Sequence, residues 1–146
     1  MNLFGVMDIS ASGLKAERVR AEVVAANMAN AETTRTADGG PYQRQQVVFQ
    51  QAGSDGFAAS LLGSANTSTV AGGVDVAGVV SATGAPLERY DPQHPDAGLD
   101  GYVSYPDINP LTEMVDLMGA TRSYGLNATA VQAEKSMVAS SLDILK

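Results

Sequence analysis

The stretch AANMANAETTRT, residues 25–36, lies where a long helical pattern in the sequence ends. Asn27 and Asn30 are three residues apart, so on a helix their two carboxamides lie on one face. A threonine-rich segment follows directly, and β-branched residues favour extended backbone. The stretch therefore predicts that a helix ends close to residue 30 and that extended chain follows it.

Two interpretations of this asparagine pair are open from the pattern alone. In the first, the amides only terminate the helix, since asparagine tolerates the left-handed conformation of a helix cap. In the second, the amides hydrogen-bond across to the returning C-terminal helix or to neighbouring chains. They would then fix a register that apolar contact alone leaves loose.

The segment that ends with this pair, residues 8–30, contains one glycine and no proline and carries two apolar stripes at helical spacing. One stripe comprises Ile9, Ala16, Val19, Val23 and Ala26. The other lies nearly opposite and comprises Met7, Leu14, Ala21, Ala25 and Met28. An ordinary surface helix shows one apolar stripe and a wide polar face. We therefore predict that this helix packs on both sides.

The other end of the chain repeats this pattern. After Pro110, which suits the first turn of a helix, no proline interrupts the chain up to residue 146. Eight of ten positions in steps of three and four are apolar, which predicts a coiled-coil seam. These positions are Met114, Leu117, Thr121, Tyr124, Ala128, Val131, Lys135, Val138, Leu142 and Leu145. A second stripe comprises Ala130, Ala133, Met137 and Ile144, so one partner helix would leave apolar surface uncovered.

The middle of the chain has a different composition. Residues 42–49 and 74–80 alternate and are rich in β-branched side chains, which predicts two short strands. The segment 50–73 between them is rich in Gly, Ala, Ser and Thr and is expected to be a flexible insertion. Residues 88–110 are dense in Pro, Gly and Asp and predict a chain of turns.

These segments predict an α+β fold that is mainly α. The helices within residues 1–32 and 110–146 are expected to pair as a coiled-coil-like hairpin. Residues 33–109 are expected to form a small β-containing domain between them.

Composition excludes several classes of function. The net charge is −7, with 9 Lys and Arg scattered among 16 Asp and Glu, which disfavours binding to nucleic acid or to anionic membranes. The chain contains no cysteine, which rules out disulfides and thiolate chemistry. No stretch approaches the roughly 20 apolar residues of a membrane-spanning helix. The amino terminus does not resemble a cleaved signal peptide, so export from the cytoplasm would need another route.

No motif in the sequence predicts catalysis, a cofactor or a metal site. His94 is the single histidine, and it lies between Pro92 and Pro95 with no nucleophile or second histidine to act with. We interpret it as a turn residue whose ring hydrogen-bonds backbone or a nearby Asp. The alternative is a small metal-dependent enzyme built around His94.

Six acidic residues and no Lys or Arg occur between Arg89 and Arg122. Their spacing does not match a calcium-binding loop. Acidic residues in turns are the simpler explanation, and an acidic surface that meets a basic neighbour is the other. The six are Asp91, Asp96, Asp100, Asp107, Glu113 and Asp116.

Four blocks of the sequence carry a family resemblance. They are DISASGLKAERVRAEVVAANMANAETTRT (8–36), GGPYQRQQVVF (39–49), YDPQHPDAGLDGYVSYPDIN (90–109) and EMVDLMGATRSYGLNATAVQAEKSMVASSLDIL (113–145). In this order and spacing they resemble the bacterial flagellar rod and hook axial proteins, and more narrowly the proximal rod proteins. Glu32 departs from the small or amide residue usual there, and residues 50–73 match no part of the family.

The resemblance implies a structural subunit of the flagellar basal-body rod and not an enzyme. Such subunits polymerise with themselves and with other proximal and distal rod proteins into a hollow drive shaft. The shaft crosses the periplasm, carries motor torque, contains the export channel and meets the export gate and basal ring at its base. Its subunits are exported uncleaved by the flagellar type III system. An adaptor or needle-like component of another secretion apparatus is the alternative.

The resemblance also implies which residues form subunit interfaces. One stripe of each terminal helix would pack on the partner helix of the same chain, and the other on neighbouring subunits. On the first helix the expected interface residues are Ile9, Leu14, Val19, Val23, Asn27, Met28 and Asn30. On the last helix they are Met114, Leu117, Tyr124, Val131, Val138, Leu142 and Leu145.

Overall fold

A computed structural model describes residues 3–37, 39–52 and 72–144 of the chain. Most of the expected insertion 50–73, together with Leu145, lies outside these described residues. Two long helices account for about half of the described residues, and two small antiparallel sheets lie between them in sequence. The elements are α1 (Leu3–Ala29), β1 (Gln45–Gln51), β2 (Val74–Ser81), β3 (Leu87–Tyr90), β4 (Tyr102–Tyr105) and α3 (Pro110–Ile144).

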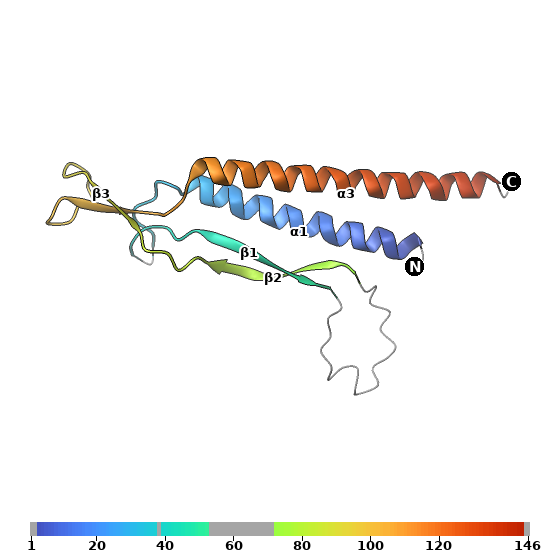
Figure 1. Cartoon of the computed structure of the whole chain (residues 1–146), viewed down its shortest axis with the longest axis horizontal. Helices are drawn as coiled ribbons and strands as arrows, with labels where there is room; N and C mark the ends of the chain where they lie inside the picture. The colour runs from blue at the N-terminus through green and yellow to red at the C-terminus, as the bar shows by residue number, and fades with distance from the viewer. Residues whose placement is uncertain (1–2, 38, 53–71, 145–146) are drawn as a thin grey trace, which may run out of the picture.

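The molecule is elongated, and α1 is the middle layer of three (Figure 1). Helix α3 runs antiparallel to α1 along one side, and the β1–β2 hairpin lies along the other side. Both chain ends lie at one end of this stack, and the β3–β4 hairpin extends from the opposite end. The prediction that the first helix packs on two sides is therefore confirmed. The second partner is a hairpin of the same chain, where the resemblance implied a neighbouring subunit.

The β1–β2 hairpin follows from its alternating β-branched residues. Gln45 pairs with Ser81 and Gln51 with Val74, and a bulge interrupts the register between Val48 and Phe49. The predicted strands 42–49 and 74–80 are thus present with shifted ends.

The prediction that residues 88–110 are only turns is wrong. Leu87 pairs with Tyr105 and Tyr90 with Tyr102, which makes a second hairpin of two four-residue strands. The strand residues include Val103, which is 1% exposed and anchors the hairpin. The Pro, Gly and Asp residues that predicted turns gather mainly in the loop between the two strands. Two such short strands are too brief for an alternation signal in the sequence.

The contact between α1 and α3 uses small and polar side chains. Its inner stripe on α3 repeats every seven residues: Glu113, Ala120, Asn127 and Glu134. Gly13 on α1 allows a close approach, because a β-carbon there would lie 3.0 Å from the Asn127 Nδ2 atom. Ala16 and Val24 are buried apolar residues of α1.

The predicted coiled-coil seam is displaced by one residue from this inner stripe. Met114, Tyr124 and Leu142 of that seam are exposed, and Leu117, Val131 and Val138 are half-buried. Glycine, alanine and polar residues bring the two helix axes together, whereas Met114, Tyr124 and Leu142 remain exposed outside this contact. The coiled-coil seam is therefore not confirmed as the contact between α1 and α3, because only some of its residues are half-buried.

Candidate functional site

The carboxamide of Asn27 is the centre of a buried polar junction that joins α1, the start of β1 and the start of α3. Asn27 is 0% exposed, and four hydrogen bonds satisfy its side chain. Its Nδ2 donates to the Gln45 carbonyl at 2.8 Å and to Glu113 Oε2 at 3.1 Å. Its Oδ1 accepts from the Gln45 amide at 2.9 Å and from the Tyr42 hydroxyl at 3.1 Å. The amide therefore fixes the register of three segments at once.

The Glu113 carboxylate is the charged half of the junction, and it is 1% exposed. Arg44 Nε donates to Glu113 Oε1 at 2.7 Å, so both carboxylate oxygens have partners. Arg44 also lies 3.7 Å from Asp116, which in turn lies 3.7 Å from Arg20 of α1. A buried charge needs this degree of pairing to be tolerated.

Tyr42 closes the junction toward solvent. Burial of the hydroxyl raises its pKa above the usual value, and the negative charge of Glu113 raises that pKa further. The phenol therefore stays protonated and able to donate to Asn27. Because its pKa is higher in the folded chain than in the unfolded chain, its contribution to stability is complete below about pH 10 and is lost as the pH rises through the folded value.

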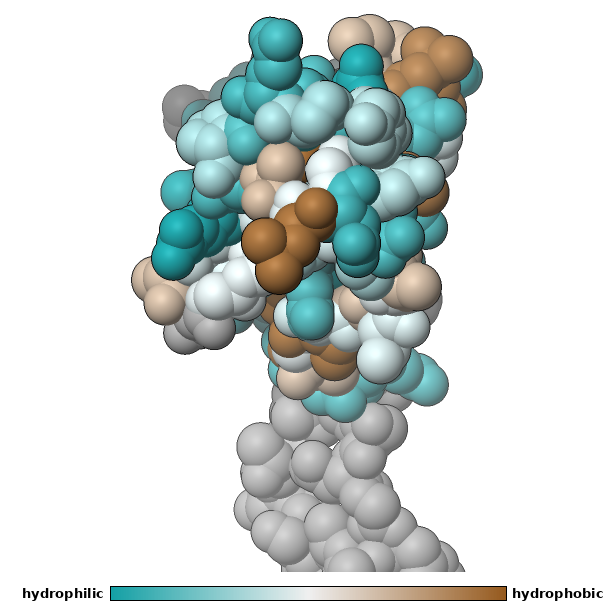
Figure 2. Space-filling model, turned by 90° about the vertical axis from the view of Figure 1, so that its left-hand side faces the viewer, coloured by the Kyte–Doolittle hydropathy of each residue, from teal (hydrophilic) through white to brown (hydrophobic). Residues whose placement is uncertain are grey.

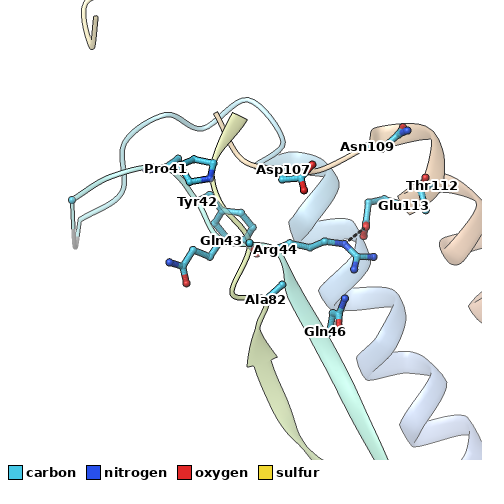
Figure 3. Close-up of a pocket in the computed structure, with 13 residues that line it drawn as sticks. Pro41, Tyr42, Gln43, Arg44, Gln46, Ala82, Asp107, Asn109, Thr112 and Glu113 are labelled. Atoms are coloured by element: carbon cyan, nitrogen blue, oxygen red, sulfur yellow. Dashed lines mark hydrogen bonds and ion pairs between the residues drawn. The ribbon is translucent and has the colours of Figure 1, made fainter. Parts of the chain in front are cut away.

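A cavity of about 560 Å³ opens beside the junction, between the loop that precedes β1 and the first turn of α3. Figure 3 shows the Arg44 side chain crossing this space to Glu113, with Asp107, Asn109 and Thr112 above it. Asn109 caps α3, since its Oδ1 accepts from the Leu111 amide at 3.0 Å. Two charged residues that line the cavity, Arg44 and Glu113, are thus paired with each other within the chain.

Asn30 has a different role from Asn27. Its Nδ2 donates back to the Ala26 carbonyl at 2.9 Å, and its Oδ1 accepts from the Thr33 hydroxyl at 3.2 Å. No described non-glycine residue has a positive φ, so the left-handed cap is not the explanation for either asparagine. The second interpretation of the pair, a bond to the returning helix, holds for Asn27 alone.

The acidic run of residues 91–116 does not form one acidic surface. Asp96 accepts from the Thr34 hydroxyl at 2.8 Å and lies 3.6 Å from Arg35. Glu113 and Asp116 likewise pair with Arg44, so these acidic residues have basic partners within the chain. His94 accepts a hydrogen bond from the Asp96 amide at its Nδ1, 3.1 Å away, which confirms its interpretation as a turn residue.

The interface residues expected on α1 lie mostly between the layers of the molecule. Ile9, Leu14, Val19, Val23 and Met28 are half-buried, as is Asn30. Those expected on α3 divide between the inner contact and solvent, as described for the seam. The junction residues Glu113, Arg44 and Tyr42 were not predicted. Arg44 and Glu113 are 69 positions apart, and no local pattern connects them.

Six large apolar side chains form an exposed surface of α3, and four of them lie in its first nine residues. We call this surface the outward face of α3; it comprises Leu111, Met114, Val115, Met118, Leu126 and Met137, each 49–70% exposed. A single exposed apolar residue is ordinary, but a stripe of them along one helix marks an interaction surface. Of these six residues, the sequence analysis named Met137 in the second stripe and Met114 in the seam, and it did not name the other four.

Glu134 is a buried carboxylate of the α1–α3 contact, at 5% exposure. Its Oε2 has no hydrogen-bond partner in the described part of the chain. We expect Glu134→Leu to raise the free energy of unfolding by about 1–2 kcal/mol, because it removes a buried charge that is incompletely paired. Urea unfolding of the purified chain measures this. The neighbouring exposed residue supplies the control Lys135→Leu, which should change stability by less than about 0.5 kcal/mol. A loss of stability in Glu134→Leu would contradict the expectation.

Among the described residues, no helix is long and apolar enough to cross a membrane. Within the same residues, no group of three or more His, Cys, Asp or Glu side chains is placed to hold a metal ion.

Comparison with protein families gives the class of this molecule. Residues 7–35, which span most of α1 and the asparagine pair, match the family described as flagella basal body rod protein. Residues 99–144, which span β4 and α3, match the family described as flagellar basal body rod FlgEFG protein C-terminal. The two matched segments, which contain α1 and α3 and meet at the junction, are thus those of a flagellar rod protein.

Relatives that match over nearly their full length show which kind of flagellar rod protein this chain resembles. The flagellar basal-body rod protein FlgC of Bacillus subtilis is 41% identical, and the match covers 100% of both chains. FlgC of Borreliella burgdorferi is 36% identical over 100% of this chain and 99% of its own. FlgC of Salmonella typhimurium is 36% identical over 99% of this chain and 98% of its own. The chain belongs to the FlgC family and is a structural subunit of the flagellar basal-body rod.

Proposed function

We propose that the chain is an axial subunit whose α1–α3 pair lies in the wall of the rod and whose outward face packs against neighbouring subunits. The rod would be a hollow shaft that spans the periplasm, transmits motor torque and contains the export channel. The observation that carries this proposal is the outward face of α3, whose six large apolar side chains are left exposed by the chain's own fold. Burial of such surface contributes about 25 cal/mol per Å².

The polar junction would give this subunit its rigidity. Torque loads the contacts between elements, and apolar contact alone allows helices to slide along one another. Directional hydrogen bonds at Asn27 and an ion pair between Arg44 and Glu113 oppose such sliding. We propose that the junction keeps the helix pair and the β1–β2 hairpin in one register under load.

The interface residues of the sequence analysis fit this proposal in two groups. Half-buried residues of α1, such as Leu14 and Val19, would support the helix pair from within. Exposed residues of α3, such as Met114, Tyr124 and Leu142, would contact neighbours directly. In the assembled rod the α1–α3 pair would act as the coiled-coil-like hairpin that the sequence predicts, with additional helices supplied by adjacent subunits.

We further propose that the chain leaves the cytoplasm uncleaved through the flagellar type III system and binds other proximal and distal rod proteins, with the export gate and basal ring at its base. The family assignment supports assembly with rod components. No observation favours the adaptor of another secretion apparatus or the metal-dependent enzyme.

The test is complementation in the bacterium that carries the gene, with the chromosomal copy deleted. A tagged copy should restore swimming, co-purify with isolated basal bodies and retain residues 1–15 by mass spectrometry. Recovery of the tagged chain only from the cytoplasm, in cells that swim, would contradict the proposal.

A further inference from the structure

The end of the molecule opposite the two termini carries a fully exposed leucine. Figure 2 views the molecule from this end and shows apolar atoms near its centre, ringed mostly by polar ones. Leu99, in the loop between β3 and β4, is the most exposed large apolar side chain described. Asp100 follows it directly in the sequence.

Hydrogen bonds hold the loop that presents Leu99 in one shape. The Gly98 amide donates to the Tyr102 carbonyl and the Gly101 amide to the Gly98 carbonyl, each at 2.9 Å. Gly101 adopts a φ of +75°, and a β-carbon there would lie 2.9 Å from the Tyr90 ring, so only glycine closes this turn without strain. Because hydrogen bonds already hold this turn in one shape, the leucine that it presents has little conformational freedom left to lose on binding. This favours its use as a contact.

A pocket of about 230 Å³ lies at the other end of the same hairpin, where β3 and β4 meet the first turn of α3. Its apolar walls include Leu87, Tyr105, Pro106 and Ile108, and Arg89 and Glu32 lie at its edge. The Arg89 guanidinium lies 5.9 Å from the centre of the Tyr105 ring and forms no ion pair with any residue the structure describes.

We propose that Leu99 of one chain inserts into this Leu87–Tyr105 pocket of a second copy, with Asp100 beside Arg89. Within one chain the contact is impossible, because Leu99 lies beyond the Tyr90–Tyr102 end of the hairpin and the pocket lies at its Leu87–Tyr105 end. Asp100, like Arg89, has no ion-pair partner among the described residues, so the two charges are complementary. A contact between two different patches of identical chains is heterologous, and it propagates as an open helix where the rotation between copies does not close a ring. This inference rests on the proposed function, and it identifies one contact between two copies of the chain in that assembly.

Because the chain has no cysteine, disulfide cross-linking in assembled basal bodies tests the contact cleanly. Two differently tagged copies, Leu99→Cys and Leu87→Cys, are co-expressed in the deletion strain, and the isolated basal bodies are oxidised. We expect a cross-linked species that carries both tags. Both positions are exposed, so neither substitution should impair folding. The matched control replaces Leu99→Cys by Gln93→Cys, an exposed position in the same loop, and should give no such species.

Basal bodies that contain both tagged chains but no cross-link above the control would overturn the contact while leaving the axial role intact. Absence of the tagged but otherwise unsubstituted chain from basal bodies would instead overturn the axial role, and the contact with it. Charge reversal gives a second readout: Asp100→Arg should reduce swimming, and adding Arg89→Asp to the same chain should restore it. A double variant that swims no better than Asp100→Arg would also overturn the proposal.

Discussion

Asn27→Ala is expected to lower the free energy of unfolding by about 3 kcal/mol or more, the largest effect of any single side-chain truncation in this chain. The substitution removes four hydrogen bonds and leaves a buried carboxylate, a hydroxyl and a peptide group without their partner. Each unsatisfied buried polar group costs about 1–3 kcal/mol. Urea unfolding followed by circular dichroism measures the change.

The sequence supplies its own control for this experiment. Asn30 is the same residue type, three positions further along and just past the end of α1, but its two hydrogen bonds are local. Asn30→Ala should lower stability by about 1 kcal/mol. In the double variant Asn27→Ala with Asn30→Ala, the chain should be exported but assemble poorly, with the defect due to residue 27. Equal effects of the two single substitutions would contradict the assignment of the junction to Asn27.

Met118→Asp combined with Leu126→Asp is expected to abolish swimming and incorporation into basal bodies. Both side chains lie on the outward face of α3 and point away from the chain's own core, at 57% and 65% exposure. Since surface substitutions usually change stability by less than about 0.5 kcal/mol, the purified variant should unfold like the unsubstituted chain. Charges on the proposed subunit interface, in contrast, would have to be buried without partners.

The control for this pair is Gln132→Asp, which adds a charge to an already polar and exposed position of the same helix. It should assemble and swim normally. Normal assembly of the Met118→Asp, Leu126→Asp variant would show that the outward face is not an interface. A large loss of stability in the purified variant would show that the face already packs within the chain.

Local patterns predicted those parts of the fold that depend on local sequence. The two stripes of α1 correctly indicated two packing partners, and alternation located β1 and β2 to within a few residues. Pro110 begins α3 as expected, with Asn109 as its cap. In each case the signal is a spacing of apolar residues or a preference of one residue for a helix end.

The helix face was not predictable in the same way. A heptad repeat has the same period on every face of a helix, so positions 114 and 113 begin equally regular series. What selects the inner one is how closely the two helices approach, and that depends on Gly13 of the other helix. Small and polar residues at a close contact give no hydrophobic signal, and the stronger apolar pattern includes residues that stay exposed in the chain.

The polar junction was missed for a related reason. Asn27 was singled out from the helix end, but its partners come from loops and helix starts far along the chain. Glu113 is 86 positions from Asn27, and its burial follows only from the way α3 returns beside α1. The sequence shows Glu113 as one acidic residue among six.

The most direct test of this account is the thiol accessibility of Leu126→Cys in the free chain and in isolated basal bodies. Because no other cysteine is present, a maleimide reagent reports on this position of the outward face alone. We predict rapid labelling of the purified chain and protection in basal bodies. Gln93→Cys should label in the free chain as well, which controls for reagent access. Equal labelling of Leu126→Cys in the free chain and in basal bodies would contradict the claim that this helix face is buried between subunits of the rod.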